Sequence, residues 1–415
     1  MTLERTDLLD NLFESFLQES RIFKNRDVLR HDFIPAYLPH RDEQTRMIGS
    51  ILAPVLNGSR PSNIFIYGKT GTGKTAVVKF VLDKLVRKSR ELHASIEVCY
   101  VNCRIAGTDY RVLSQLCESI GLHIPFTGLA VGEVFDRFKG ALESKRILLI
   151  TVLDEVDALI KAKGDAVLYE LTRINENLKF GRVSILGISN NLRFKELLDP
   201  RVLSSLSEEE AVFRPYSAPE LHDILQERSK LAFLDAALGA GVINLCSALA
   251  AAEHGDARRA LDLLRVAGEL AERHSEKLVT EEHVRQAQEK IEQDRVVEVL
   301  KTLPLHSKLV LFGVYLIKKT NSNGSITGDV FEVYKELCGQ LGVEVLTQRR
   351  VSGLINELDI MGVLNARVVS FGRYGRTKKV SIGVSSSVIR NIFIDDSWVG
   401  RLLDYAPNCL KTKSN

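Results

Sequence analysis

Eight residues with the spacing of a phosphate-binding loop lie between a strand-like and a helix-like segment. Gly68-Lys-Thr-Gly-Thr-Gly-Lys-Thr75 has the form G-x-x-x-x-G-K-T. Glycines at these positions let the backbone bend and turn its N–H groups toward phosphate oxygens. Lys74 would place its charge near the β- and γ-phosphates, and the Thr75 hydroxyl would bind Mg²⁺. An ordinary glycine turn is the alternative, which the flanking strand and helix disfavour. The motif predicts a nucleotide site formed by Gly68, Lys69, Thr70, Gly71, Thr72, Gly73, Lys74, Thr75 and Ala76.

Two acids and an asparagine follow apolar runs that are typical of buried strands. Asp154 and Glu155 end the run 145–155, and Asn190 ends the run 183–190. The carboxyl ends of parallel strands meet at one edge of a sheet, so these side chains are expected beside the phosphates. There Asp154 could hold Mg²⁺, Glu155 could orient the attacking water, and Asn190 could help to position it. The alternatives are a solvated acidic pair and a turn asparagine.

Arginines and a proline-rich segment supply further candidates for the nucleotide site. Arg201 could reach the nucleotide of a neighbouring subunit as an arginine finger, or form a salt bridge within its own chain. Arg258 begins a predicted helix and could fold over the γ-phosphate of its own chain. Pro39, His40 and Arg41 precede the first predicted helix, where they either line the base or form a surface connector.

The segments that must position these residues alternate between strand and helix patterns as far as Pro215, which predicts a parallel α/β sheet. Beyond Pro215 the strand signals stop and four helical patterns follow. Pro304 then opens a third part that contains helices and a basic hairpin. The expected strands lie over 63–66, 96–103, 145–155 and 183–190. We expect a nucleotide-binding domain with an N-terminal arm over 1–215, an all-helical domain over 216–298, and an α+β domain over 299–410.

Composition indicates a soluble globular protein with several domains. The chain has 415 residues, of which 45% are hydrophobic and 26% are charged. No apolar run approaches the ~20 residues of a membrane helix, and the N-terminus is too acidic and polar for a signal peptide. None of the six cysteines forms a C-x-x-C pair, which disfavours a zinc site or disulfides. We therefore expect a cytoplasmic protein with reduced thiols and no membrane partner.

The C-terminal part is basic and has features of a DNA-binding module. Residues 301–415 hold 16 Lys and Arg against 9 Asp and Glu, although the whole chain carries a net charge of only +3. A helix over 347–361 begins with four residues suited to a recognition helix, and a basic glycine-rich tip over 372–377 lies between two strand-like segments. The alternative for the tip is a solvated hairpin. The expected DNA contacts here are Thr347, Gln348, Arg349, Arg350, Arg367, Arg373, Tyr374, Arg376 and Lys378.

In this order the motifs resemble those of the AAA+ ATPases. Gly68–Thr75 resembles Walker A, Asp154 with Glu155 resembles Walker B, Asn190 resembles sensor 1, and Arg258 resembles sensor 2. Several segments are more specifically similar to the archaeal origin-recognition and helicase-loading initiators, from about Ile22 to about Gly383. These segments are Leu38–Arg41, Leu153–Asp157, Asp199–Val202, Ser204–Glu210 and Glu253–Leu261. Thr151 departs from the aliphatic run usual before the Walker B aspartate, although threonine suits a strand.

The resemblance implies a P-loop AAA+ domain, a helical lid and a winged-helix domain. It implies ATP or ADP with Mg²⁺, and Tyr216 and Arg228 are further expected nucleotide contacts. It also implies a helical insertion near residues 104–122 that touches DNA, with Arg104, Tyr110 and Arg111 as contacts.

The implied activity is weak ATP hydrolysis that acts as a switch in a replication initiator of the nucleoid. The implied partners are double-stranded origin DNA, the replicative helicase and paralogous initiators. The alternatives are a nucleotide-switched transcription regulator that binds promoters, and a scaffold whose ATPase gates protein partners.

Overall fold

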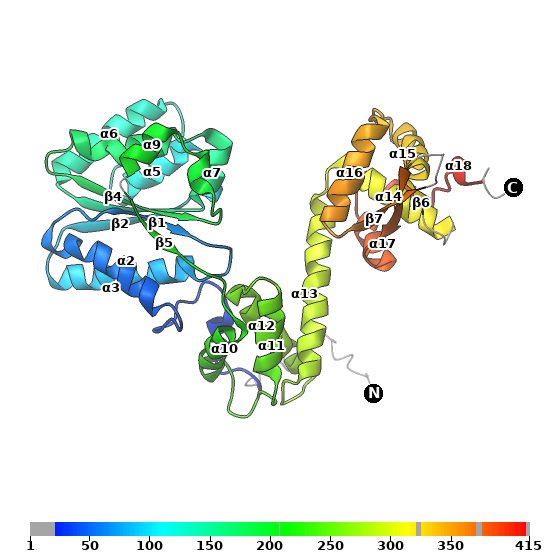
Figure 1. The fold of residues 1–415 in the computed structure, drawn as a ribbon, viewed down its shortest axis with the longest axis horizontal. Coiled ribbons are helices and arrows are strands. Elements are labelled where there is room, and N and C mark those ends of the chain that lie inside the picture. The colour runs from blue at the N-terminus through cyan, green and yellow to red at the C-terminus, as the bar shows by residue number, and fades with distance from the viewer. Residues whose placement is uncertain (1–20, 207, 321–324, 371–375, 412–415) are drawn as a thin grey trace, which may run out of the picture. The chain divides into compact units, whose positions relative to one another are not determined.

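The computed structural model describes residues 21–206, 208–320, 325–370 and 376–411 (Figure 1). The chain divides into two compact units, residues 1–287 and 288–415. The predicted DNA contacts Arg373 and Tyr374 lie outside the described residues. Among the helices of the described ranges, none combines the length and the apolar character that crossing a bilayer requires.

The first unit is built on a five-stranded parallel sheet in the order β2-β3-β4-β1-β5. Strands β1 and β3 are buried at every position, because helices cover both faces of the sheet. Figure 1 shows α2 and α3 on one face and α5 and α6 on the other. The predicted parallel α/β fold is confirmed. The strands are β1 (Asn63–Tyr67), β2 (Ile96–Asn102), β3 (Leu148–Asp154), β4 (Arg182–Ser189) and β5 (Glu208–Val212).

Strand β5 was not predicted from the sequence. Its first three residues, Glu208 to Glu210, are all acidic and give no hydrophobic pattern. Within the described residues the strand pairs with β1 alone, so it lies at the edge of the sheet. Charged side chains are common on such edges because they discourage pairing with another chain.

Some helices of the first unit cover the two faces of the sheet. Helices α10, α11 and α12 form a separate helical lid. Helix α13 (Glu281–Thr302) begins in this unit and continues into the second. The other helices are α2 (Asp42–Leu52), α3 (Lys74–Glu91), α4 (Cys103–Ala106), α5 (Asp109–Ser119), α6 (Val131–Lys145), α7 (Val156–Lys163), α8 (Ala166–Arg173), α9 (Pro200–Leu206), α10 (Ala218–Ala232), α11 (Val242–Ala252) and α12 (Ala257–Arg273).

The N-terminal segment is attached to the lid. Phe23 forms a bridge with Phe233, and their ring centroids lie 4.9 Å apart. Arg26 forms an ion pair with Glu272 of α12 at 2.9 Å. The first described residues therefore belong structurally to the helical lid, although they precede the sheet in the chain.

The second unit has the elements of a winged helix, as predicted. Its antiparallel sheet has the order β6-β8-β7 and packs against three helices around a buried core. The elements are α14 (Leu305–Thr320), β6 (Ser325–Ile326), α15 (Thr327–Leu341), α16 (Gln348–Ile360), β7 (Leu364–Ser370), β8 (Arg376–Ile382), α17 (Ser386–Ile394) and α18 (Asn408–Lys411).

Thr151 is a polar residue in the middle of the buried strand β3. Its side chain has no exposed surface, and its hydroxyl has no hydrogen-bond partner among the described residues. Its neighbours in the sheet are Cys99 of β2 and Ile185 of β4. A buried hydroxyl without a partner costs stability, because it loses its hydrogen bond to water on folding.

We predict that Thr151→Val stabilises the protein by about 1 kcal/mol, because the substitution removes an unpaired hydroxyl and nearly preserves the shape. Urea unfolding followed by circular dichroism would measure the change. Thr172→Val is the matched control, since the buried Thr172 hydroxyl donates to the Tyr169 carbonyl at 2.8 Å. The control should lose stability, and a loss in Thr151→Val as well would contradict the prediction.

Candidate functional site

A cavity of about 850 Å³ opens between the carboxyl edge of the sheet, the glycine-rich loop and the lid. Most of its wall comes from four parts of the chain, which are residues 31–39, residues 70–76, the ends of three strands, and the lid. Lys79 of α3 and Ile105 of α4 complete the lining. The strand ends contribute Tyr100, Asn102, Asp154, Glu155 and Asn190, and the lid contributes residues that include Ile224, Arg228, Arg258 and Leu261. Its volume suits a nucleotide-sized ligand.

The glycine-rich loop packs tightly against the start of lid helix α12. Gly71 has a φ of +71°, and a Cβ there would lie 1.7 Å from the Asp256 carboxylate. The Gly71 carbonyl accepts a hydrogen bond from Ala257 N at 3.0 Å, while Asp256 caps α12. The position therefore needs glycine both for its backbone angle and for close approach.

Lys74 lies folded inside the loop. Its Nζ donates to the carbonyls of Gly68 and Lys69, each at 2.6 Å. Burial lowers the pKa of the Lys74 ammonium to about 8, and the nearby Asp154 carboxylate opposes that shift. A phosphate group in the cavity would add negative charge next to this ammonium. Gly68 and Lys69 themselves are not among the lining residues, whereas residues 70–76 are.

Asp154 is held by hydrogen bonds on both carboxylate oxygens. Thr75 Oγ1 donates to Asp154 Oδ2 at 3.1 Å, and Glu155 N donates to Oδ1 at 2.9 Å. The Tyr100 hydroxyl also donates to Oδ2. Sequence reasoning missed Tyr100 because it lies inside an otherwise apolar strand pattern. The one signal was a hydroxyl two residues before the end of a strand that leads to this edge.

Glu155 and Asn190 also lie at the cavity, as their positions after strands predict. Glu155 has a φ of +53°, which is unusual for a residue with a side chain and costs conformational energy. Its carboxylate lies 3.8 Å from the Arg104 guanidinium of α4. Asn190 N donates to Asp157 Oδ1 at 3.3 Å, which anchors the turn after β4.

The segment before α2 divides into lining and bracing residues. Pro39 lines the cavity, but His40 and Arg41 do not. Arg41 is buried, donates to the carbonyls of Thr72 and Arg214, and stacks on the Tyr216 ring at 3.8 Å. His40 pairs with Asp223 of α10 at 2.8 Å. Arg41 thus joins the glycine-rich loop to the segment that leads into lid helix α10.

Among the other predicted nucleotide residues, Tyr216, Arg228 and Arg258 line the cavity. The Arg228 guanidinium donates to the carbonyls of Val28 and Phe33, and burial lowers its pKa to about 10. Arg228 therefore holds the N-terminal segment against the lid. Arg201 lies outside the lining and donates to Asp199 at 3.0 Å, which is the intrachain salt bridge that the sequence left open.

Four of the predicted DNA contacts of the second unit lie at the start of α16. Thr347 caps the helix through a hydrogen bond from Arg350 N, and Gln348 and Arg349 are exposed. The Arg350 guanidinium lies 3.2 Å from Glu357. Along the β-ribbon, the exposed Arg367 is paired in register with Lys379, Lys378 donates to Asn356 of α16, and Arg376 begins β8.

The predicted contacts of the insertion lie on α4 and α5. Arg104 and Arg111 are exposed, whereas Tyr110 is half-buried and its hydroxyl donates to the Pro125 carbonyl. The hydroxyl of Tyr110 is thus used inside the fold. The two arginines remain accessible to a ligand.

Comparison with known proteins matches all three parts of the chain. Residues 57–193 match the family described as AAA domain, residues 222–289 the Cdc6 AAA+ ATPase-type lid domain, and residues 298–392 the CDC6 C-terminal winged helix domain. The ORC1-type DNA replication protein of Thermococcus onnurineus is 54% identical over 95% of this chain and 96% of its own.

The chain belongs to the family of ORC1-type DNA replication proteins. The Pyrococcus furiosus member is also 54% identical over 95% of both chains. The structure of the Aeropyrum pernix Orc1 protein in complex with DNA has a TM-score of 0.82 and 50% identity, covering 92% of this chain and 100% of that chain. This ORC1-type chain is thus an AAA+ ATPase of DNA replication, and the relatives favour replication over promoter regulation.

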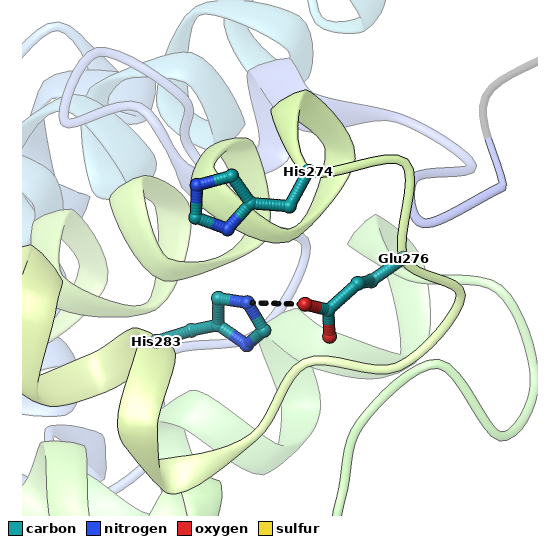
Figure 2. A group of neighbouring side chains, drawn as sticks. All are labelled: His274, Glu276 and His283. Atoms are coloured by element: carbon teal, nitrogen blue, oxygen red, sulfur yellow. Dashed lines mark ion pairs between the residues drawn. The ribbon is translucent and has the colours of Figure 1, made fainter.

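Where lid helix α12 leads into α13, a cluster of His274, Glu276 and His283 has polar atoms that could surround a metal ion (Figure 2). His283 Nδ1 accepts a hydrogen bond from Thr280 N at 3.1 Å, so the proton of the neutral ring is on Nε2. That protonated nitrogen faces Glu276 Oε1 at 3.6 Å. A metal bound to Nε2 would move the ring proton to Nδ1. The Nδ1–H and the Thr280 N–H would then be two donors that face each other. The geometry therefore favours a cap of α13 over a metal site.

We predict that His283→Ala destabilises the lid by about 1 kcal/mol, because it removes the hydrogen bond that satisfies Thr280 N–H. Thermal unfolding of the full chain would measure the loss. Zn²⁺ should leave the melting temperature of the parent unchanged. A rise with Zn²⁺ that disappears in His274→Ala would instead establish a metal site.

Proposed function

We propose that this chain is an ATP-controlled initiator that binds double-stranded origin DNA and helps to load the replicative helicase. The observation that carries the proposal is one cavity that combines a phosphate-binding loop, Asp154, Glu155 and the lid residue Arg258. The relative whose structure contains DNA supports a DNA ligand for the winged helix.

The residues at the loop suit a magnesium ion. Thr75 Oγ1 and the Asp154 carboxylate offer oxygen ligands 3.1 Å apart, and Mg²⁺ prefers oxygen. A hydroxyl can use a lone pair for a metal while it donates its proton, so the Thr75–Asp154 hydrogen bond is compatible with that role. When bound, Mg²⁺ would neutralise charge on the β- and γ-phosphates.

Hydrolysis would depend on residues around the γ-phosphate. Glu155 would orient the attacking water and Asn190 would help to position it, while Lys74 and Arg258 would stabilise the charge that develops on the phosphate. Because Arg258 belongs to the lid, loss of the γ-phosphate would remove a contact that holds the lid. We infer that weak hydrolysis serves as a switch between two lid positions.

Binding to DNA would use the exposed N-terminus of α16 in the major groove, with the β-ribbon as a second contact. Arg104 and Arg111 of the insertion would give another contact on the first unit. The Arg201 side chain is largely exposed. It could leave its partner Asp199 and contact a nucleotide bound by a neighbouring initiator. Phosphate contacts of this kind make affinity fall with salt.

We predict that Glu155→Gln retains nucleotide binding but lowers ATP turnover by about 100-fold, because an amide cannot accept a proton from the attacking water. Single-turnover release of phosphate would measure the rate, and fluorescence titration with an ATP analogue would measure affinity. Glu170→Gln, on the exposed face of α8, is the matched control. Normal turnover in Glu155→Gln would remove Glu155 from this role.

We predict that Arg349→Ala weakens duplex binding and reduces the slope of log affinity against log salt by about one, the contribution of one phosphate contact. Fluorescence anisotropy at several salt concentrations would measure both quantities. Arg390→Ala on α17 removes the same charge from another exposed surface and serves as the control. A flat salt dependence of the parent itself would argue for the scaffold alternative.

A further inference from the structure

We propose that Tyr100 is a positioning residue for the magnesium site, an inference that rests on the function proposed above for Thr75 and Asp154. Tyr100 would hold the Asp154 carboxylate in the orientation that a cation bound by Thr75 requires. It would act through Asp154 and would not contact the phosphates.

The first support is the sheet register. Asn102 of β2 is paired with Asp154 of β3, and Tyr100 is paired with Val152. Residues two apart on a strand share a face, so Tyr100 and Asp154 are diagonal neighbours on the same face of the sheet. The phenol ring spans this diagonal, and its hydroxyl donates to Asp154 Oδ2.

The second support is the set of donors around a buried carboxylate. Asp154 is 7% exposed, and Glu155 N donates a hydrogen bond to its Oδ1. Oδ2 accepts from Thr75 and from Tyr100. If the Thr75 hydroxyl turns to bind a cation more directly, the Tyr100 hydroxyl still restrains Oδ2. Hydrogen bonds to a ligating carboxylate from side chains that do not touch the metal orient that carboxylate.

The third support is the way in which the ring itself is fixed. Lys79 places its ammonium 5.0 Å from the centroid of the Tyr100 ring and lines the same cavity. Lys79 lies one turn after Thr75 on α3, so the helix that supplies the Thr75 hydroxyl also holds Tyr100.

The test is Tyr100→Phe in the full-length chain, which removes the hydroxyl and keeps the ring. A fluorescent ADP would be titrated first in EDTA and then with increasing Mg²⁺. We expect the affinity in EDTA to stay within about twofold of the parent, and the Mg²⁺ concentration for half-maximal tightening to rise by about tenfold. Tyr169→Phe is the matched control, because its hydroxyl accepts a hydrogen bond from Arg173 of α8 and lies outside the cavity lining.

Asp154→Asn separates failure of this inference from failure of the proposed site. If nucleotide affinity of the parent does not respond to Mg²⁺, or Asp154→Asn responds like the parent, the magnesium site itself is refuted. If the parent responds and Asp154→Asn does not, the site stands and Tyr100→Phe becomes decisive. An unchanged Mg²⁺ midpoint in Tyr100→Phe would overturn the positioning role.

Two other results would also overturn it. A lower Mg²⁺ requirement in Tyr100→Phe would mean that the hydroxyl obstructs the cation. An equal loss of affinity with and without Mg²⁺, together with a lower melting temperature in EDTA, would mean that the hydroxyl serves only the stability of the sheet.

Discussion

Parallel pairing of β3 between β2 and β4 is the constraint on which the nucleotide site depends. It brings Asp154 into register with Asn102 on one side and Ile188 on the other, so three strand ends meet at one edge. The glycine-rich loop leaves β1 at that same edge, and α3 then presents Thr75 to Asp154. The buried carboxylate is satisfied only because hydrogen-bond donors from α3, β2 and its own backbone converge on it.

The lid takes part in the site through short backbone contacts as well as through Arg258. Asp256 caps α12 while its carboxylate fills the space above Gly71, so the start of this helix and the loop share one surface. The N-terminal segment is fastened to the lid by Arg228 and contributes residues 31–39 to the cavity wall. A movement of the lid would therefore change the cavity wall formed by residues 31–39 together with the contact between the lid and the glycine-rich loop.

The winged-helix unit exposes basic residues at the start of α16 and on the β-ribbon. The Arg350 guanidinium lies 3.2 Å from Glu357, and Lys378 donates a hydrogen bond to Asn356, so both basic groups have partners on α16. Gln348 and Arg349 remain exposed at the helix start. Phosphate contacts position such a domain on duplex DNA, and base contacts supply its specificity.

The sequence alone was enough to predict the phosphate-binding loop, the acids at the end of β3 and the order of the three parts, because these features depend on local motifs and on short-range hydrophobic periodicity. It did not reveal β5, because the three glutamates of that edge strand break the hydrophobic pattern by which a strand paired with β1 would be recognised. Only the tertiary structure placed the Tyr100 hydroxyl on Asp154, 54 positions away, and the Arg228 guanidinium on the Val28 carbonyl, 200 positions away. Contacts over such separations arise from the register of strands and the packing of helices, which no local pattern specifies.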